Sequence, residues 1–330
     1  MKERNSNFEL LRIIAMMFIV IFHISFHAQK CELETHNYVT SITSTGVNLF
    51  LLISGYFGIN LKWKNLLNTL NIIIFYYVVS LIATCITFNK LPTFGEIINI
   101  FTPISRNPWW FMKCYIVLML ISPALNVITQ KASETQYKQI VITLTALTVI
   151  SGYIFSNQYV NHNGFTLFQF INIYFIGNAI SRYKFAEKLT KRHWLIIYIV
   201  STITLFFIYN DIDKSIRYNN PFLIIAAISL FCFIARLKIK SKMVNTVATF
   251  MLPIYLLQES PFGFRIYSHL YELGKTMFFT GIEYWMTICI YIITLIATAV
   301  VFEGIRRVCF CNIIDKLSTR LRIKANIFNE

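Results

Sequence analysis

The chain has 330 residues, of which 56% are hydrophobic and only 14% are charged, and its formal net charge is +15. A soluble domain of this length has no interior that buries so much apolar surface, so the composition excludes an ordinary soluble protein. A basic chain of this kind raises the question of nucleic-acid binding, but no DNA- or RNA-binding motif is present.

Ten apolar segments follow one another along the chain. Runs of about 18 or more apolar residues cross ~30 Å of hydrocarbon, and helices satisfy their own backbone polar groups there. The segments, of which the second, eighth and ninth are short, cover residues 8–26, 44–59, 66–88, 109–128, 139–155, 165–180, 194–209, 222–235, 244–258 and 284–302. We therefore predict an all-α, multi-pass integral membrane bundle of about ten helices, with Pro253 kinking or breaking the ninth. It forms one domain over residues 1–330, ending in a basic tail from 306 to 330.

The basic residues set the expected orientation. With the N-terminus in the cytosol, 22 Lys and Arg residues fall on the inner side of the ten segments and 7 on the outer side. Inner loops of membrane proteins carry this excess, so both termini are predicted to be cytosolic. The net charge then reflects topology and contact with anionic lipid, and no nucleic-acid partner is expected.

The first segment carries polar groups that hydrocarbon disfavours. Arg12 and His23 are eleven residues apart, almost three helical turns, so they share one face and lie ~16 Å apart along the axis. Glu9 can pair with Arg12 across three residues, and His27 follows His23 by one turn. A polar stripe of this kind is typical of a helix that faces a bundle interior or a water-filled cavity.

Less specific interpretations of the stripe remain open on residue types alone. Arg12 also suits a side chain that extends to the inner membrane surface, and His27 suits an interface residue. A single buried histidine is also compatible with hydrogen-bonded packing. A cleaved signal peptide is disfavoured, because Arg12 interrupts the apolar core and no small-residue cleavage site follows.

Four segments resemble a known family. "FELLRIIAMMFIVIFH" is similar to the first helix of the membrane-bound acyltransferase family 3, in which an arginine and a histidine are separated by ten residues, here Arg12 and His23. "GVNLFLLISGYFGI" (46–59), "WWFMKCYIVLMLISPALN" (109–126) and "LPIYLLQES" (252–260) resemble later family segments in the same order.

The chain also departs from the family pattern at two places. Gln258 stands where a histidine is usual, so no acid–base role is assigned to it. Lys62 and Lys64 stand where some members have arginines, and lysine holds a phosphate as a point charge without bidentate geometry.

The resemblance implies a membrane O-acyltransferase of a bacterial plasma membrane. It would move an acyl group, usually acetyl, from cytosolic acetyl-CoA to a hydroxyl of a cell-surface or lipid-linked polysaccharide, without a metal. His23 is the expected catalytic residue, either as the base for the hydroxyl or as a transient acyl acceptor. Arg12, Lys62 and Lys64 are expected to hold the coenzyme A phosphates at the inner mouth, with Glu9 supporting Arg12.

Three residues are candidates for the acceptor side. Trp110 and Tyr115 begin the fourth segment at the outer surface, where aromatic rings stack on sugars, although an interfacial aromatic belt explains them equally well. Glu259 ends the ninth segment, and it suits orientation of His23, binding of acceptor hydroxyls, or a solvated loop.

Two other classes remain as alternatives. A transporter or flippase of a lipid-linked saccharide also needs many helices and a polar interior, but the chain has no internal repeat and no matching pair of broken helices. A structural or sensory membrane partner leaves the stripe of Arg12 and His23 unexplained.

Overall fold

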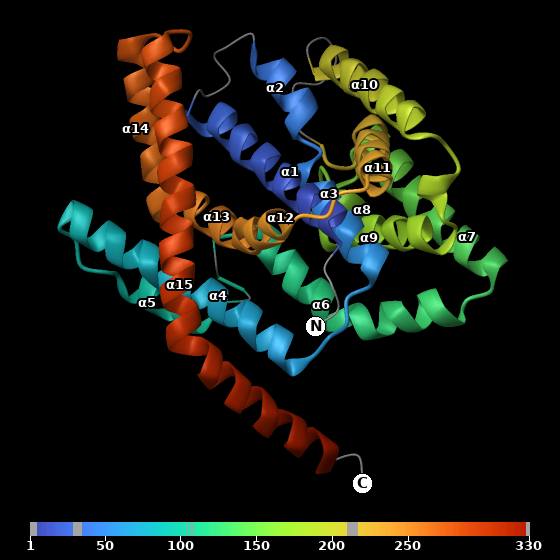
Figure 1. Cartoon of the computed structure of the whole chain (residues 1–330), viewed down its shortest axis with the longest axis horizontal. Coiled ribbons are helices and arrows are strands. Elements are labelled where there is room, and N and C mark those ends of the chain that lie inside the picture. Colours follow the sequence, from blue (N-terminus) through green and yellow to red (C-terminus); the bar gives the residue numbers. More distant parts are fainter. Residues whose placement is uncertain (1–4, 29–34, 104, 107, 210–216, 328–330) are drawn as a thin grey trace. The chain divides into compact units, whose positions relative to one another are not determined.

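The computed structural model describes residues 5–28, 35–103, 105–106, 108–209 and 217–327, and in that part of the chain it is all-helical, without strands (Figure 1). The α-helices are α1 Ser6–His23, α2 Thr35–Thr43, α3 Gly46–Phe57, α4 Trp63–Phe88, α5 Phe94–Phe101, α6 Trp110–Lys131, α7 Glu134–Ala146, α8 Gln158–Asn161, α9 Leu167–Arg182, α10 Lys191–Phe207, α11 Pro221–Ala235, α12 Lys242–Val247, α13 Met251–Gln258, α14 Pro261–Met277 and α15 Ile282–Ile327. π-Helical turns follow α1 (η1, Ile24–Ala28) and α7 (η2, Leu147–Ile154), and 3₁₀ turns lie at η3 (Phe185–Glu187) and η5 (Ala248–Phe250). The all-α class predicted from the sequence is confirmed.

Five helices are long and apolar enough to cross a membrane. They cover Ser6–Ala28, Trp63–Phe88, Trp110–Lys131, Glu134–Ile154 and Ile282–Leu321. The remaining predicted segments correspond to shorter helices, among them α3, α9, α10 and α11. The architecture is that of a multi-pass membrane protein, and the count of ten crossings stays a prediction.

The chain folds into two compact units, each made of two stretches of sequence. Unit 1 comprises Met1–Ile59 and Leu120–Met251, and unit 2 comprises Asn60–Met119 and Leu252–Glu330. That residues 1–330 form a single domain stays a prediction.

In unit 1, α1 is fixed at its N-terminal end. Asn5 caps the helix, since its side chain accepts from the backbone N–H of Asn7. The Asn7 side chain in turn donates to the carbonyls of Ala235 and Leu237 and accepts from the N–H of Ile239 at 2.9 Å. α1 is thus tied to the segment that follows α11.

Glycines allow close approach of helices in unit 1. A Cβ at Gly46 would lie 2.7 Å from the Ala15 carbonyl of α1, so the backbones of α3 and α1 approach each other closely there. A Cβ at Gly55 would lie 2.0 Å from the Tyr174 carbonyl, and one at Gly177 would lie 2.4 Å from the Leu52 carbonyl. The contact between α3 and α9 therefore requires glycine on both helices.

The variant Gly55→Ala is expected to lower the thermal stability of the detergent-solubilised protein. The added methyl would collide with backbone that has no room to move, and overpacking of this kind costs about 1–3 kcal/mol or more. Gly95→Ala is the matched control, because no atom lies within 4 Å of a Cβ built there and alanine favours the helix. Equal melting temperatures for the two variants would show that the α3–α9 contact is not tight.

Buried polar side chains connect the ends of helices in unit 1. The Tyr174 hydroxyl donates to Asn126 Oδ1 at 2.6 Å and accepts from the Ile59 N–H at 3.1 Å. Asn48 donates to the Tyr218 carbonyl at 3.1 Å, and Gln169 donates to the same carbonyl at 2.9 Å. Such bonds between buried groups hold helices together, which makes Asn48 a structural residue.

Unit 2 is built on α4, α14 and α15, and α14 runs alongside the first half of α15 (Figure 1). The sequence predicts a last helix over 284–302 followed by a tail, but α15 continues without a break to Ile327. The polar residues after 302 are good helix formers, so the helix persists where its apolar character ends.

Arg306, expected in the basic tail, lies instead in a buried ion pair. Its guanidinium binds both carboxylate oxygens of Glu303 at 2.8 Å, and it also donates to the side chains of Asn71 and Asn68 of α4 at 2.8 and 3.2 Å. The side chains of Arg306 and Glu303 are each only 3% exposed. This cluster joins α15 to α4.

Replacing Glu303 by glutamine is expected to destabilise the protein by about 3–5 kcal/mol, because it leaves the buried Arg306 guanidinium without its counter-charge. Arg307→Ala is the control, since Arg307 pairs with the same carboxylate at 2.7 Å but its side chain is 42% exposed. Exposed ion pairs contribute about 0–1 kcal/mol. Thermal unfolding in detergent compares the two, and an equal loss would contradict the buried network.

Two further predictions differ from the structure in detail. The segment 244–258 is not one helix, because η5 separates α12 from α13 and Pro253 lies in the first turn of α13, where no backbone donor is required. The helices α2, α5 and α14 were not expected from the sequence, since none is a long apolar run.

Candidate functional site

The candidate catalytic and donor-binding residues of α1 lie on one uninterrupted helix. α1 runs as a regular α-helix from Ser6 to His23, so the expected rise of ~16 Å between Arg12 and His23 applies without a break. Both side chains are half-buried. Most neighbours on this helix are apolar and buried, which leaves few polar groups on it.

Arg12 forms the ion pair that the sequence predicts. Its guanidinium donates to the Glu9 carboxylate three residues earlier. The Glu9 side chain is 7% exposed and the Arg12 side chain 31% exposed. The carboxylate is therefore enclosed and fixes the arginine, whereas part of the guanidinium remains accessible for an anionic ligand.

A change of helix type follows His23 directly. The backbone passes from α1 into the π-helical turn η1, which carries His27 in its last turn. The two imidazole rings lie 5.8 Å apart, and Phe22 stands edge-on to His23 at 5.5 Å. The expected placement of both histidines on one side is confirmed, and π-helical turns are frequent at functional sites.

Lys62 and Lys64 lie at a pocket of unit 2. The pocket has a volume of about 500 Å³ and is lined by Lys62, Trp63, Lys64, Ser318 and Thr319. Lys64 also pairs with Asp315 of α15 at 2.7 Å. Two lysines, two hydroxyls and an exposed indole at the N-terminal end of α4 suit a phosphorylated ligand.

The candidate acceptor residues Trp110 and Tyr115 belong to an aromatic cluster of unit 2. Phe111 stacks on Tyr115 at 5.7 Å, stands edge-on to Trp110 at 6.1 Å and contacts Tyr255 of α13 at 6.0 Å. Trp110 and Tyr115 are half-buried, so part of each ring remains exposed.

Glu259 follows the last residue of α13, one turn after Tyr255. It is not a solvated loop residue, because it is only 9% exposed and accepts from the Tyr267 hydroxyl at 3.4 Å. Its carboxyl is thus enclosed beside the Tyr267 hydroxyl and is able to accept further hydrogen bonds.

The candidate residues therefore form one group in unit 1 and two in unit 2. Glu9, Arg12 and His23 share α1, the two lysines line the basic pocket, and the aromatic cluster adjoins the helix that ends before Glu259.

Sequence reasoning missed several residues of these groups. Trp63, Ser318 and Thr319 were not selected, although Trp63 lies between the two lysines that were. Tyr255 and Tyr267 were also missed. Tyr255 precedes Glu259 by four residues and Tyr267 follows it by eight, and this helical spacing was the available signal. Ser318 and Thr319 carried no signal, because their approach to α4 depends on the continuation of α15.

Comparison with known proteins gives the family. The family model described as "Acyltransferase domain", of the acyltransferase 3 type, matches residues 5–304. No curated protein and no solved structure matches the chain. The family match covers nearly the whole sequence, from the cap of α1 to the buried Glu303, and the chain belongs to the acyltransferase 3 family of membrane acyltransferases.

Proposed function

We propose that the protein is a membrane O-acyltransferase that moves an acyl group, acetyl in the simplest case, from cytosolic acyl-CoA to a hydroxyl of a cell-surface or lipid-linked polysaccharide. The observation that carries the proposal is the unbroken α1 with Arg12 and His23 along it, in a chain of the acyltransferase 3 family. The proposal includes ten crossings of a bacterial plasma membrane with both termini in the cytosol.

The donor's phosphates are assigned to the basic residues. Coenzyme A carries several negative charges at one end and the thioester at the other, joined by a long flexible arm. Arg12, held by Glu9, and the lysines of the pocket at the start of α4 supply the positive charges for the phosphates. The ~16 Å rise from Arg12 to His23 suits the length of the arm.

The chemistry is assigned to His23. A sugar hydroxyl is a weak nucleophile near neutral pH, and an imidazole within hydrogen-bond reach accepts its proton as the oxygen attacks the thioester carbonyl. The carbon–sulfur bond then breaks, and the thiolate takes that proton to leave as free coenzyme A. In the two-step form the imidazole nitrogen displaces the thiolate first, and the thiolate takes the ring N–H proton and leaves as coenzyme A. The sugar oxygen then attacks the acyl carbon, the carbon–nitrogen bond breaks, and the hydroxyl proton returns to the imidazole.

The acceptor is assigned to unit 2. The partly exposed rings of Trp110 and Tyr115 provide apolar faces for a sugar, and the carboxyl of Glu259 provides a hydrogen-bonding group for its hydroxyls. These two residue types are the usual partners of a carbohydrate, which combines apolar ring faces with hydroxyl edges.

Mass spectrometry of the cell-surface glycan tests the proposal. Cells that lack the protein are compared with cells that carry it, after the total amount of exported glycan has been measured. We expect the glycan to be exported in equal amounts and to lack one O-acyl substituent. Loss of export with normal acylation would instead indicate a transporter.

A further inference from the structure

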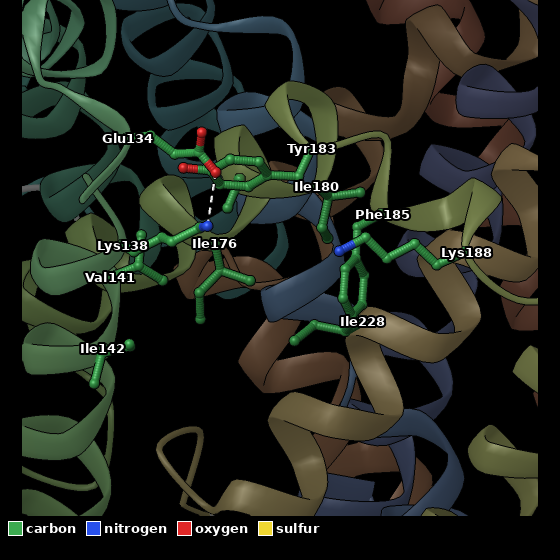
Figure 2. A pocket seen from close by; sticks show the side chains of 11 residues that line it. Glu134, Lys138, Val141, Ile142, Ile176, Ile180, Tyr183, Phe185, Lys188 and Ile228 are labelled. Carbon is green, nitrogen blue, oxygen red and sulfur yellow. Dashed lines mark ion pairs between the residues drawn. The ribbon is translucent and has the colours of Figure 1, made fainter. Parts of the chain in front are cut away.

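Unit 1 contains a pocket that the proposed acyl transfer does not use. Its volume is about 400 Å³, which is in the range of pockets that hold small organic ligands. Figure 2 shows the side chains that line it, which come from α7, α9, α11 and the turn after α9. Glu134 and Lys138 line the pocket on the α7 side and Lys188 lines it on the side of the turn after α9 (Figure 2), and the other lining side chains are apolar apart from Tyr183.

The apolar part consists of branched side chains from three helices. Ile176 and Ile180 of α9 are buried at its base, and Ile228 of α11 lies across from α7 (Figure 2). On α7, Ile142 is 67% exposed, so the pocket opens on that side. An apolar cleft that opens toward the lipid-facing side of a membrane helix accommodates a hydrocarbon chain.

The charged part has an excess of cations. Lys138 pairs with Glu134 at 2.6 Å, four residues earlier on α7. Lys188 lies over the Phe185 ring at 5.3 Å and forms no ion pair with any residue that the structure describes. The lining thus holds two lysines against one carboxylate, and Lys188 is available to an anion.

Arg182 adds positive charge beside the pocket and fixes its wall. Its guanidinium donates to the carbonyls of Thr129 and Ala132 at 2.9 and 3.1 Å, at the end of α6, and lies over the Tyr137 ring at 4.7 Å. The next residue, Tyr183, lines the pocket, and within the described part of the chain its buried hydroxyl has no hydrogen-bond partner. A buried hydroxyl of this kind gains from a nearby acceptor oxygen.

We propose that this pocket binds one anionic phospholipid of the membrane, with its phosphate between Lys138 and Lys188 and one acyl chain along Ile176, Ile180 and Ile228. The segment that follows α9 carries five Lys and Arg residues between Arg182 and Arg192 and is among the most basic of those predicted to face the cytosol, where anionic phosphates are concentrated. The positive charge of the two lysines, the apolar isoleucine side chains and the predicted cytosolic position of the pocket are all met by one anionic phospholipid.

Lipid binding by the full-length protein tests this inference without reference to acyl transfer. The purified protein is reconstituted into nanodiscs of phosphatidylcholine containing a trace of labelled phosphatidylglycerol or labelled phosphatidylcholine, and the lipid that remains bound after exchange into detergent is measured. The wild type should retain phosphatidylglycerol and little phosphatidylcholine. The double variant K138A/K188A should retain it at least tenfold less, since each lysine near such a surface contributes about fivefold.

Two further variants separate the charged and apolar parts. Lys191→Ala removes an exposed lysine of the same basic segment that does not line the pocket, and retention should stay within twofold of the wild type. Ala179→Phe fills the apolar part while leaving both lysines, and it should reduce retention of phosphatidylglycerol as strongly as the double variant. Melting temperatures of all variants should match the wild type.

Three results would overturn the inference. Equal retention of the two lipids would remove the charge selectivity, and equal losses in K191A and K138A/K188A would show that general basicity attracts the lipid. Displacement of the label by long-chain acyl-CoA, but not by unlabelled phosphatidylglycerol, would assign the pocket to a donor acyl chain.

Discussion

Replacing His23 by alanine is expected to abolish acyl transfer, lowering kcat by at least about 100-fold, while the amount and melting temperature of the protein stay close to those of the wild type. The reason is chemical: a positioned general base contributes about 10²–10⁴-fold, and no other histidine precedes η1 on the helix that carries Arg12. Acylation of the glycan in cells and transfer from labelled acetyl-CoA by purified protein are the two measurements.

The control for this variant is His269→Ala. His269 is exposed on α14 and contacts none of the candidate groups described above, so its removal should leave acylation unchanged. If His23→Ala retains near-normal turnover while folded, the imidazole is a packing residue and the catalytic assignment fails. If both variants lose activity together, the loss does not depend on the position of His23, and the catalytic assignment also fails.

The same assay separates the two chemical routes. Wild-type protein incubated with acetyl-CoA and no acceptor is analysed by intact mass and by peptide mapping. The transient-acceptor route predicts one acetyl group on the peptide that contains His23, removed on addition of hydroxylamine or acceptor. The direct route predicts that no peptide is acetylated. It also predicts that coenzyme A is released at the normal rate once the acceptor is added.

Replacing Arg12 by alanine is expected to raise the KM for acetyl-CoA by about tenfold to 100-fold, with a smaller effect on kcat. A charge-assisted hydrogen bond to phosphate contributes about 1.5–3 kcal/mol, and this variant removes it. Arg12→Lys should fall between wild type and alanine, because lysine restores the charge but not the bidentate geometry. Initial rates at varied donor concentration give both constants.

A truncated donor provides the control. Acetyl-pantetheine has the thioester but none of the nucleotide phosphates, so wild type and Arg12→Ala should use it at equal, low rates. A persistent deficit of the variant with acetyl-pantetheine would mean that Arg12 supports the helix rather than the phosphate. Glu9→Gln should resemble Arg12→Ala only weakly, since the guanidinium keeps its charge.

Local sequence spacing predicted the core of the candidate site. Glu9 and Arg12 pair across one helical turn, and His23 and His27 lie together, because side chains three or four residues apart meet on any helix. The all-helical class followed from composition. These features depend on neighbours along the chain, which sequence periodicity describes well.

What the sequence did not predict depends on distant contacts or on weak apolar character. α14 carries Arg265, His269 and Glu272 and therefore lacks the hydropathy of a membrane span. The buried pair of Glu303 and Arg306 has the same three-residue spacing as the pair on α1, but its burial needs Asn68 and Asn71 of α4. The π-helical turn after His23 has no residue-type signature that marks it.

We propose that His23 transfers an acyl group from a donor on the cytosolic side to an acceptor on the opposite side, either as the base or as the transient acyl acceptor. Sealed proteoliposomes of known orientation test this proposal, with labelled acetyl-CoA supplied only at the face bearing the N-terminus and the glycan acceptor only at the opposite face. We expect labelled glycan with wild-type protein and none with His23→Ala. Equal labelling by the two proteins, or labelling only when donor and acceptor share one face, would exclude this role of His23.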